Sequence, residues 1–132
     1  MSVFLDTSAL LAVLDADDRV HAKAKKVWKD LVGRAGIIIS TSYVLVETFA
    51  LAQHRLGIEA VRCLAEDILP IVRIHWVGEA EHRAGVTALL TAGRRELSLV
   101  DCVSFVVMRQ LNLKKAFAFD RDFAAQGFET LD

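Results

Sequence analysis

The chain has 132 residues, of which 54% are hydrophobic and 25% are charged, with a single proline. This composition excludes a disordered chain, and its formal net charge of −1 excludes a strongly basic nucleic-acid-binding domain. We therefore expect one globular domain over residues 1–132, with any contact to a polyanion confined to a local patch.

Secretion and membrane insertion are not indicated. The longest stretch without a charged residue, 35–46, has 12 residues, whereas a helix needs about 20 apolar residues to cross a bilayer. The N-terminus has no basic region before its apolar run, unlike a secretory signal. Cys63 and Cys102 are the only cysteines and lack the spacing of a disulfide or metal pair, so we interpret them as small core residues. We expect a cytoplasmic protein that does not bind a membrane.

The first part of the chain alternates short apolar runs with amphipathic segments. Residues 3–5 form an apolar run that ends at Asp6, and hydroxyl residues that can cap a helix follow directly. Apolar residues recur at helical spacing over 19–31, and 37–39 is β-branched throughout, as in a buried strand. A capped helix is predicted next, over about 42–56.

The second part continues this alternation to the C-terminus. Its predicted helices cover 58–69, 79–92 and 97–111, and its predicted strands cover 71–77, 115–119 and 128–131. The segment 97–111 is apolar nearly all round, as expected of a helix that is buried on most sides. Strands that alternate with helices favour an α/β fold, with a parallel sheet covered by helices on both faces.

Two acids directly follow predicted strands. Asp6 comes after the run 3–5, and Asp120 comes after the strand over 115–119. In an open parallel sheet, ligands bind outside the carboxyl ends of the strands, so both carboxylates can face one crevice. The alternative for either acid alone is that it caps the next helix.

Two further acids lie inside the most apolar helical segments, at Glu47 and Asp101. A buried carboxylate is costly unless it is paired or bound to a metal, and aspartate is a poor residue for a helix interior. A solvated spot on an otherwise buried helix is the alternative for each. Both acids lie within roughly two turns of the start of their helix, near the same carboxyl edge of the sheet, so all four acids can converge.

Four neighbouring carboxylates repel one another unless a divalent cation supplies the opposite charge. A ligand set made only of oxygen atoms selects a hard ion, Mg²⁺ or Mn²⁺. Such an ion polarises a phosphoryl oxygen and activates water, so the pattern predicts hydrolysis of a phosphodiester. Ser8 and Ser104 are candidates to orient carboxylates or water; a helix cap or a hydroxyl bonded to backbone is the alternative for each.

At these residues the sequence resembles PIN-domain proteins and, within that family, the VapC-type toxins of toxin–antitoxin pairs. Five segments carry the resemblance, in the order and spacing of the family: FLDTSALLA at 4–12, VLVET at 44–48, LSLVDCVSF at 97–105, AFDRDF at 118–123 and GFE at 127–129. Each segment alone is a weak signal, but together they cover nearly the whole chain.

The resemblance implies a three-layer α/β/α sandwich with a central, mainly parallel sheet. It also implies an endoribonuclease dependent on Mg²⁺ or Mn²⁺, a homodimer, and inhibition by a small antitoxin protein. The family's acidic quartet corresponds to Asp6, Glu47, Asp101 and Asp120, and common hydroxyl positions correspond to Ser8 and Ser104. Asp122 is a second candidate for the fourth position, but its place just inside the following helix favours a capping role.

Other functions remain open at this point. An aspartyl phosphatase usually needs a second aspartate where this chain has Ser8, and a receiver domain needs adjacent acids and a late lysine that are not found where expected. A PIN-domain nuclease of RNA processing, or a PIN scaffold that binds RNA or protein without cutting, would share the same fold. For substrate binding we predict that Arg94, Arg95 and Arg121 hold phosphates; plain solvated surface is the alternative.

Overall fold

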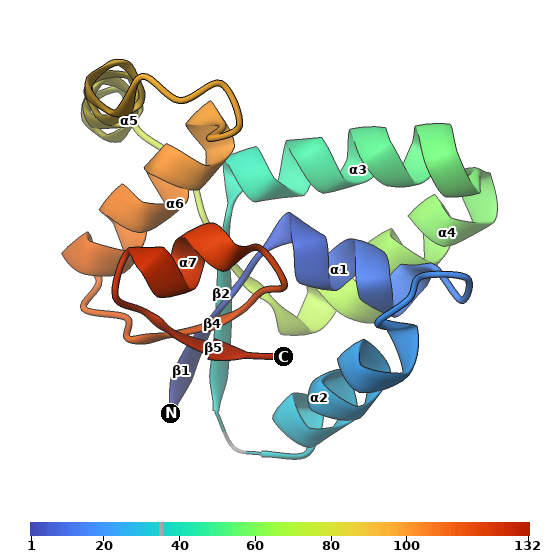
Figure 1. The fold of residues 1–132 in the computed structure, drawn as a ribbon. Helices are drawn as coiled ribbons and strands as arrows, with labels where there is room; N and C mark the ends of the chain where they lie inside the picture. The colour runs from blue at the N-terminus through green and yellow to red at the C-terminus, as the bar shows by residue number, and fades with distance from the viewer. Residues whose placement is uncertain (35) are drawn as a thin grey trace.

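A computed structural model describes residues 1–34 and 36–132, which fold around a five-stranded sheet (Figure 1). Its strand order is β3-β2-β1-β4-β5, and every neighbouring pair is parallel. The strands are β1 (Ser2–Leu5), β2 (Ile37–Thr41), β3 (Arg73–His75), β4 (Lys115–Phe117) and β5 (Glu129–Leu131). The prediction of a mainly parallel sheet is therefore confirmed.

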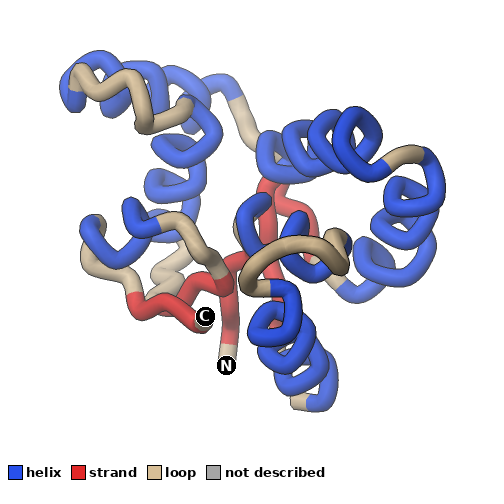
Figure 2. The backbone as a smooth tube through the Cα atoms, turned by 45° about the vertical axis from the view of Figure 1, so that its right-hand side comes forward, coloured by secondary structure: helices blue, strands red, loops and turns tan. Residues whose placement is uncertain are grey.

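Helices cover both faces of this sheet. They are α1 (Thr7–Leu14), α2 (His21–Gly33), α3 (Ser42–Leu56), α4 (Ile58–Cys63), α5 (Glu79–Ala92), α6 (Leu99–Gln110) and α7 (Arg121–Ala125). Figures 1 and 2 show α1 to α4 on one side of the sheet and α5 to α7 on the other. The expected three-layer α/β/α sandwich is thus confirmed.

The central strand β1 lies in the middle of the core. Val3, Phe4 and Leu5 are each at most 1% exposed, because β1 is flanked by strands on both edges and by helices on both faces. Phe123 of α7 packs against Phe4 and against Phe105 of α6, with ring centroids 6.1 and 5.0 Å apart. This packing fixes α6 and α7 beside the carboxyl end of β1.

The strand order also places a crevice at that end of the sheet. The chain passes from β1 to β2 on one side, and β4 later pairs with β1 on the other side. Ligands of open parallel sheets bind at such a switch point. A hydrogen bond from the Asp6 amide to the Phe117 carbonyl, 3.1 Å, joins the two strand ends. The residues that follow β1 and β4 therefore meet.

Several predicted elements have different bounds in the structure. The helix over 58–69 is α4 followed by a π-helical turn, η1 (Leu64–Ile68), and a 3-10 helix, η2 (Leu69–Ile71). The π-helical turn buries Leu64 and Ile68 together, at 0% and 4% exposure. The helix predicted from residue 97 begins at Leu99, because Ser98 is its N-cap.

Two predicted strands were too long because side chains replace the sheet as hydrogen-bond partners. The strand over 115–119 ends at Phe117, and the Phe119 amide donates to the Ser8 hydroxyl instead. The strand over 71–77 is only β3, and the Val77 amide donates to the hydroxyl of Ser42. Both strands end early, where the chain turns toward the next helix, and the strand over 71–77 also begins late, because Ile71 belongs to η2.

The two cysteines are free and differ in burial. Cys102 lies in the core, as predicted, whereas Cys63 is only half-buried, so its assignment to the core was wrong. Among the described residues, no helix combines the length and the apolar character that crossing a membrane requires.

Candidate active site

Asp6 is buried immediately after β1 and is only 3% exposed. It is the N-cap of α1, and its carboxylate accepts hydrogen bonds from the amide and the hydroxyl of Ser8, at 3.1 and 2.6 Å. The Ser8 hydroxyl also accepts a hydrogen bond from the amide of Phe119, at 2.9 Å. Ser8 therefore orients Asp6 and ties it to the segment that leads to Asp120.

Asp101 lies in the first turn of α6 and is 8% exposed. Its amide donates to the Ser98 hydroxyl at 3.0 Å, and its carboxylate accepts from the Ser98 amide at 3.4 Å, which together form a capping box. This arrangement explains how an apolar helix tolerates the acid. Ser104 donates to the Val100 carbonyl at 2.8 Å, so its hydroxyl has the structural role that the sequence left open.

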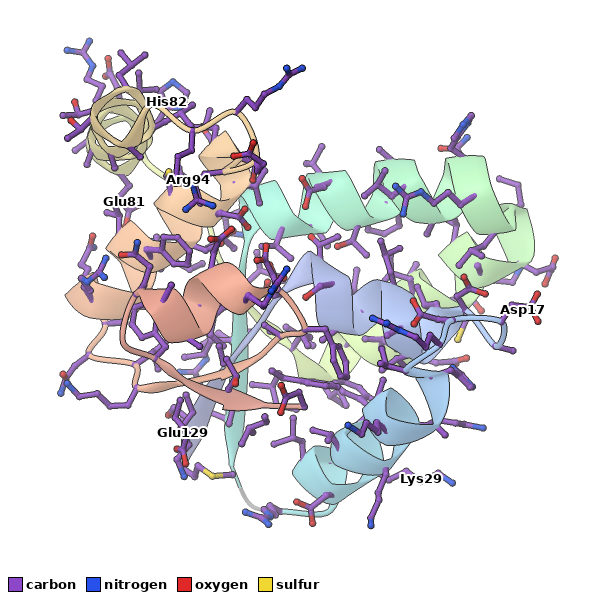
Figure 3. All side chains as sticks on the ribbon, viewed as in Figure 1. Asp17, Lys29, Glu81, His82, Arg94 and Glu129 are labelled. Atoms are coloured by element: carbon purple, nitrogen blue, oxygen red, sulfur yellow. The ribbon has the colours of Figure 1, made fainter. Side chains whose placement is uncertain are left out.

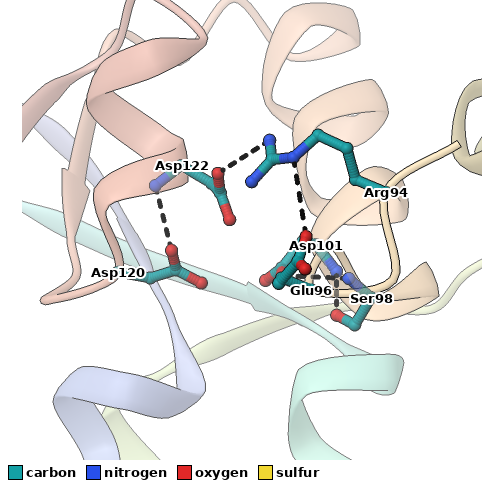
Figure 4. Close-up of polar contacts among 6 residues, drawn as sticks. All are labelled: Arg94, Glu96, Ser98, Asp101, Asp120 and Asp122. Carbon is teal, nitrogen blue, oxygen red and sulfur yellow. Dashed lines mark hydrogen bonds and ion pairs between the residues drawn. The ribbon is translucent and has the colours of Figure 1, made fainter. Parts of the chain in front are cut away.

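Asp120 and Asp122 lie across from Asp101 (Figure 4). Asp120 is the N-cap of α7 and accepts a hydrogen bond from the Asp122 amide at 2.9 Å. Carboxylate oxygens of Asp101, Asp120 and Asp122 all lie within 4.8 Å of one another. The sequence-based assignment of the capping role to Asp122 was wrong, because Asp120 caps the helix and Asp122 turns its carboxylate toward the other acids.

Glu47 comes from α3 and lines the same cleft as Asp6, Asp101 and Asp120. The cleft has a volume of about 490 Å³. A hydrogen bond of 3.1 Å from the hydroxyl of Thr48 to that of Thr7 joins α3 to α1 directly beside Glu47. The structure thus brings the four predicted acids into one cleft, with Asp6 and Glu47 outside the tightest group, which Asp101 and Asp120 form with Asp122.

The pKa values of two acids in the cleft are raised by burial and by the neighbouring charges. Burial raises the pKa of Asp6 from its ordinary value of 3.8 to about 6, aided by the charge of Asp120 and opposed by the hydrogen bonds from Ser8. Burial, together with the charges of Asp6 and Asp120, raises the pKa of Asp101 to about 7. A divalent cation would relieve this repulsion, and a donor set made of carboxylates suits a hard ion. The residues present therefore fit a divalent metal site.

The three arginines predicted to hold phosphates lie outside the cleft lining. Arg94 is engaged by acids, with Asp122 at 3.3 Å and Glu96 at 3.9 Å (Figure 4). Arg95 and Arg121 are exposed. Their role in substrate binding stays a prediction.

Two other arginines line the cleft, and sequence reasoning missed both of them. Arg19 precedes α2, and Arg55 lies in the last turn of α3. Arg55 lies eight residues after Glu47 on α3, and Arg19 lies in the segment between α1 and α2. The spacing of Arg55 from Glu47 is about two helical turns and could have placed both on one face, whereas Arg19 lies in a loop and had no such signal.

Comparisons with known proteins agree with this geometry. The PIN domain family matches residues 3–129, nearly the whole chain. The 23S rRNA-specific endonuclease VapC20 of Mycobacterium tuberculosis is 36% identical over 128 residues, which cover 96% of this chain and 95% of that protein. These matches extend over all of the acids described above.

Solved structures show the same relationship. The crystal structure of M. tuberculosis VapC20, described as a sarcin-ricin loop cleaving toxin, has a TM-score of 0.85 and 34% identity, covering 96% of this chain and 95% of that chain. VapBC2 from Rickettsia felis, solved with a DNA fragment from its promoter, shares the fold with a TM-score of 0.72 at 13% identity, covering 98% of this chain and 97% of that chain. The chain therefore belongs to the PIN-domain family and, within it, to the VapC-type ribonucleases that its sequence resembles.

Proposed function

We propose that this chain is a metal-dependent endoribonuclease that cuts 23S rRNA at the sarcin-ricin loop. The observation that carries the proposal is the acidic group of Asp101, Asp120 and Asp122, whose oxygens lie within 4.8 Å of one another. The likeness to VapC20, at 36% identity over 96% of this chain, supports the choice of RNA.

Each part of the site has a definable task in this reaction. Asp101, Asp120 and Asp122 would hold a divalent cation, which we propose to be Mg²⁺ or Mn²⁺ because all of the ligand atoms are oxygens. When bound, such a cation supplies a Lewis acid for the phosphoryl oxygen and lowers the pKa of water. Asp6, held by Ser8, and Glu47, which lines the same cleft, would position the attacking water.

The proposal extends to the biological setting. The resemblance to VapC-type toxins supports a toxin that acts in the cytoplasm and is inhibited by a small antitoxin protein.

Large apolar side chains are exposed at Val46 on α3 (67%) and Leu90 on α5 (75%), which supports a further interface, and we propose a homodimer. Size measurement of the purified chain, alone and with the product of a neighbouring small gene, tests both assemblies.

The central experiment compares cleavage of 23S rRNA by wild type and Asp101→Asn in the presence of Mg²⁺. We expect a single cut in the sarcin-ricin loop by wild type, and a rate at least about 100-fold lower for the variant. Asp67→Asn, at an exposed acid of η1, is the matched control and should cut as wild type does. Equal cleavage by wild type and Asp101→Asn, or none by either, would refute the proposal.

A further inference from the structure

A second concave surface is lined by α2 and lies outside the cleft. It has a volume of about 920 Å³ and runs between α2, the N-terminus and the end of β5. We call it the α2 groove; its lining holds five cations, Lys23, Lys26, Lys29, Arg34 and Lys115, and two acids, Asp30 and Asp132. Figure 3 shows Lys29 projecting from α2 at the end of the molecule opposite to His82 and Arg94. The groove is therefore distinct from the surface around Arg94.

Positive charge is concentrated along this helix. Six of the 16 cations and one of the 17 acids lie within residues 19–34, so this segment has a formal charge of +5 and the rest of the chain has −6. The overall charge of −1 hides this separation. A cationic patch of this kind attracts polyanions, in particular the phosphate backbone of a nucleic acid.

The lysines of the groove are available for a ligand. Lys23, Lys26 and Lys29 are exposed, and none of them forms an ion pair in the part of the chain that the structure describes. Arg34, by contrast, pairs with Asp30 at 2.8 Å, and Lys115 pairs with Glu129 at 3.7 Å. The three lysines thus supply the free positive charge of the groove.

The cleft itself repels RNA. Six acids and two arginines line it, so its formal charge is −4. Even with one divalent cation bound, the net formal charge of the lining stays negative. Because phosphate contacts supply most of the affinity of nucleic-acid-binding proteins, the affinity for RNA has to come from cations outside the cleft.

The linings of the cleft and of the α2 groove are neighbours in sequence at the start of α2. Arg19, just before α2, lines the cleft, and Lys23, in the first turn of α2, lines the groove, so only three residues separate them. The 13 residues of α2 span about 20 Å at 1.5 Å per residue. That length accommodates several successive phosphates of a strand.

We propose that the α2 groove is a second RNA-binding surface, which holds the backbone of a structured RNA next to the loop in the cleft. This inference rests on the proposed ribonuclease function. It assigns recognition of the RNA outside the cut site to Lys23, Lys26 and Lys29. An acidic segment of a partner protein has complementary charge too, but the neighbouring linings of the cleft and the groove favour the RNA.

The test removes the free charge of the groove without changing the site. In one variant Lys23, Lys26 and Lys29 are all changed to glutamine, which is a good helix former. The matched control changes Lys25, Arg73 and Lys114 to glutamine; these residues are exposed, lie outside the groove lining, and leave the same net charge. Circular dichroism and melting curves confirm that both variants are folded.

RNA binding is measured by filter binding in EDTA, where the RNA stays intact, with a structured 23S rRNA fragment and a short hairpin that fills only the cleft. We expect the groove variant to bind the fragment at least about tenfold more weakly, and to lower the slope of log Kd against log salt by about 2 to 3. The control should bind as wild type does, and the hairpin should not distinguish the three proteins.

Cleavage with Mg²⁺ separates this inference from the proposed function. We expect the groove variant to raise KM for the rRNA fragment at unchanged kcat, and to cut the short hairpin as wild type does. If wild type cuts neither RNA, the proposed function fails, while the binding comparison still decides the role of the groove. Equal losses in the groove variant and the control, or no loss in either, overturn the inference. So does a groove variant that keeps its RNA affinity but no longer binds an acidic partner segment.

Discussion

The buried carboxylate of Asp6 predicts that the metal-free protein loses stability as the pH rises. Asp6 has its pKa raised by burial from 3.8 to about 6, so the folded state holds this proton more tightly than the unfolded state does. The corresponding stability is fully present below the unfolded pKa and is lost as the pH rises through the folded pKa. Metal-free protein should therefore be less stable at pH 8 than at pH 5.

The magnitude follows from the shift at Asp6. A pKa about 2 units above that of the unfolded chain corresponds to about 3 kcal/mol in total, of which about half is lost between pH 5 and pH 8. For a domain of this size that loss lowers Tm by about 5 °C. Asp101, whose pKa is raised to about 7, acts in the same direction, but it shares its charge repulsion with Asp6, so the two contributions do not add.

The assay is thermal unfolding in EDTA at pH 5 and pH 8, for wild type and Asp6→Asn. The variant cannot ionise at this position, so its Tm should fall less over the same interval. Mg²⁺ should raise the Tm of wild type more at pH 8 than at pH 5, because the ionised carboxylates bind the cation. If wild type and Asp6→Asn lose the same stability between the two pH values, burial does not raise the pKa of Asp6 as the structure indicates.

Three substitutions test other parts of the structure. Asp122→Asn should slow cleavage of 23S rRNA by about 100-fold while leaving Tm in EDTA unchanged or higher, because it removes one carboxylate of the group. Ser8→Ala should slow cleavage by about 10-fold, since Asp6 loses its 2.6 Å hydrogen bond, and should lower the free energy of unfolding by about 1–2 kcal/mol in a urea titration. Gly85→Ala should destabilise by about 1–3 kcal/mol despite better helix propensity, because the new methyl would lie 2.5 Å from a methyl of the buried Val103; unchanged urea stability would contradict this packing.

Sequence patterns predicted the parts of the site that depend on local structure. Asp6 and Asp120 were found because Asp6 directly follows β1 and Asp120 lies three residues after β4, and parallel strands bring their carboxyl ends to one edge. Glu47 was found because an acid interrupts an apolar helix. These signals lie within a few residues of each acid, so they can be recognised without knowledge of the tertiary structure.

The remaining features depend on contacts between distant segments. Arg19 lies in the loop between α1 and α2, and no periodic pattern indicates that this loop lines the cleft. The role of Asp122 depends on which of two acids begins α7, and helix ends are set by a balance of hydrogen bonds that a spacing rule does not resolve. The strand over 115–119 was too long because its last amide donates to Ser8, which lies more than a hundred residues away in sequence.

The sequence left open whether Asp6 and Asp120 are helix caps or site residues. The structure shows that the two roles do not exclude each other. Asp6 caps α1, Asp120 caps α7, and Asp101 completes the capping box of α6, yet all three carboxylates contribute to the acidic cleft. Backbone amides at the helix starts partly offset the negative charge, which lets the fold hold these acids together before a cation binds. Asparagine caps helices as well as aspartate does, so Asp→Asn removes the charge and keeps the cap, whereas Asp→Ala removes both. A comparison of the two substitutions at Asp120 therefore separates the catalytic contribution of the carboxylate from its contribution to stability.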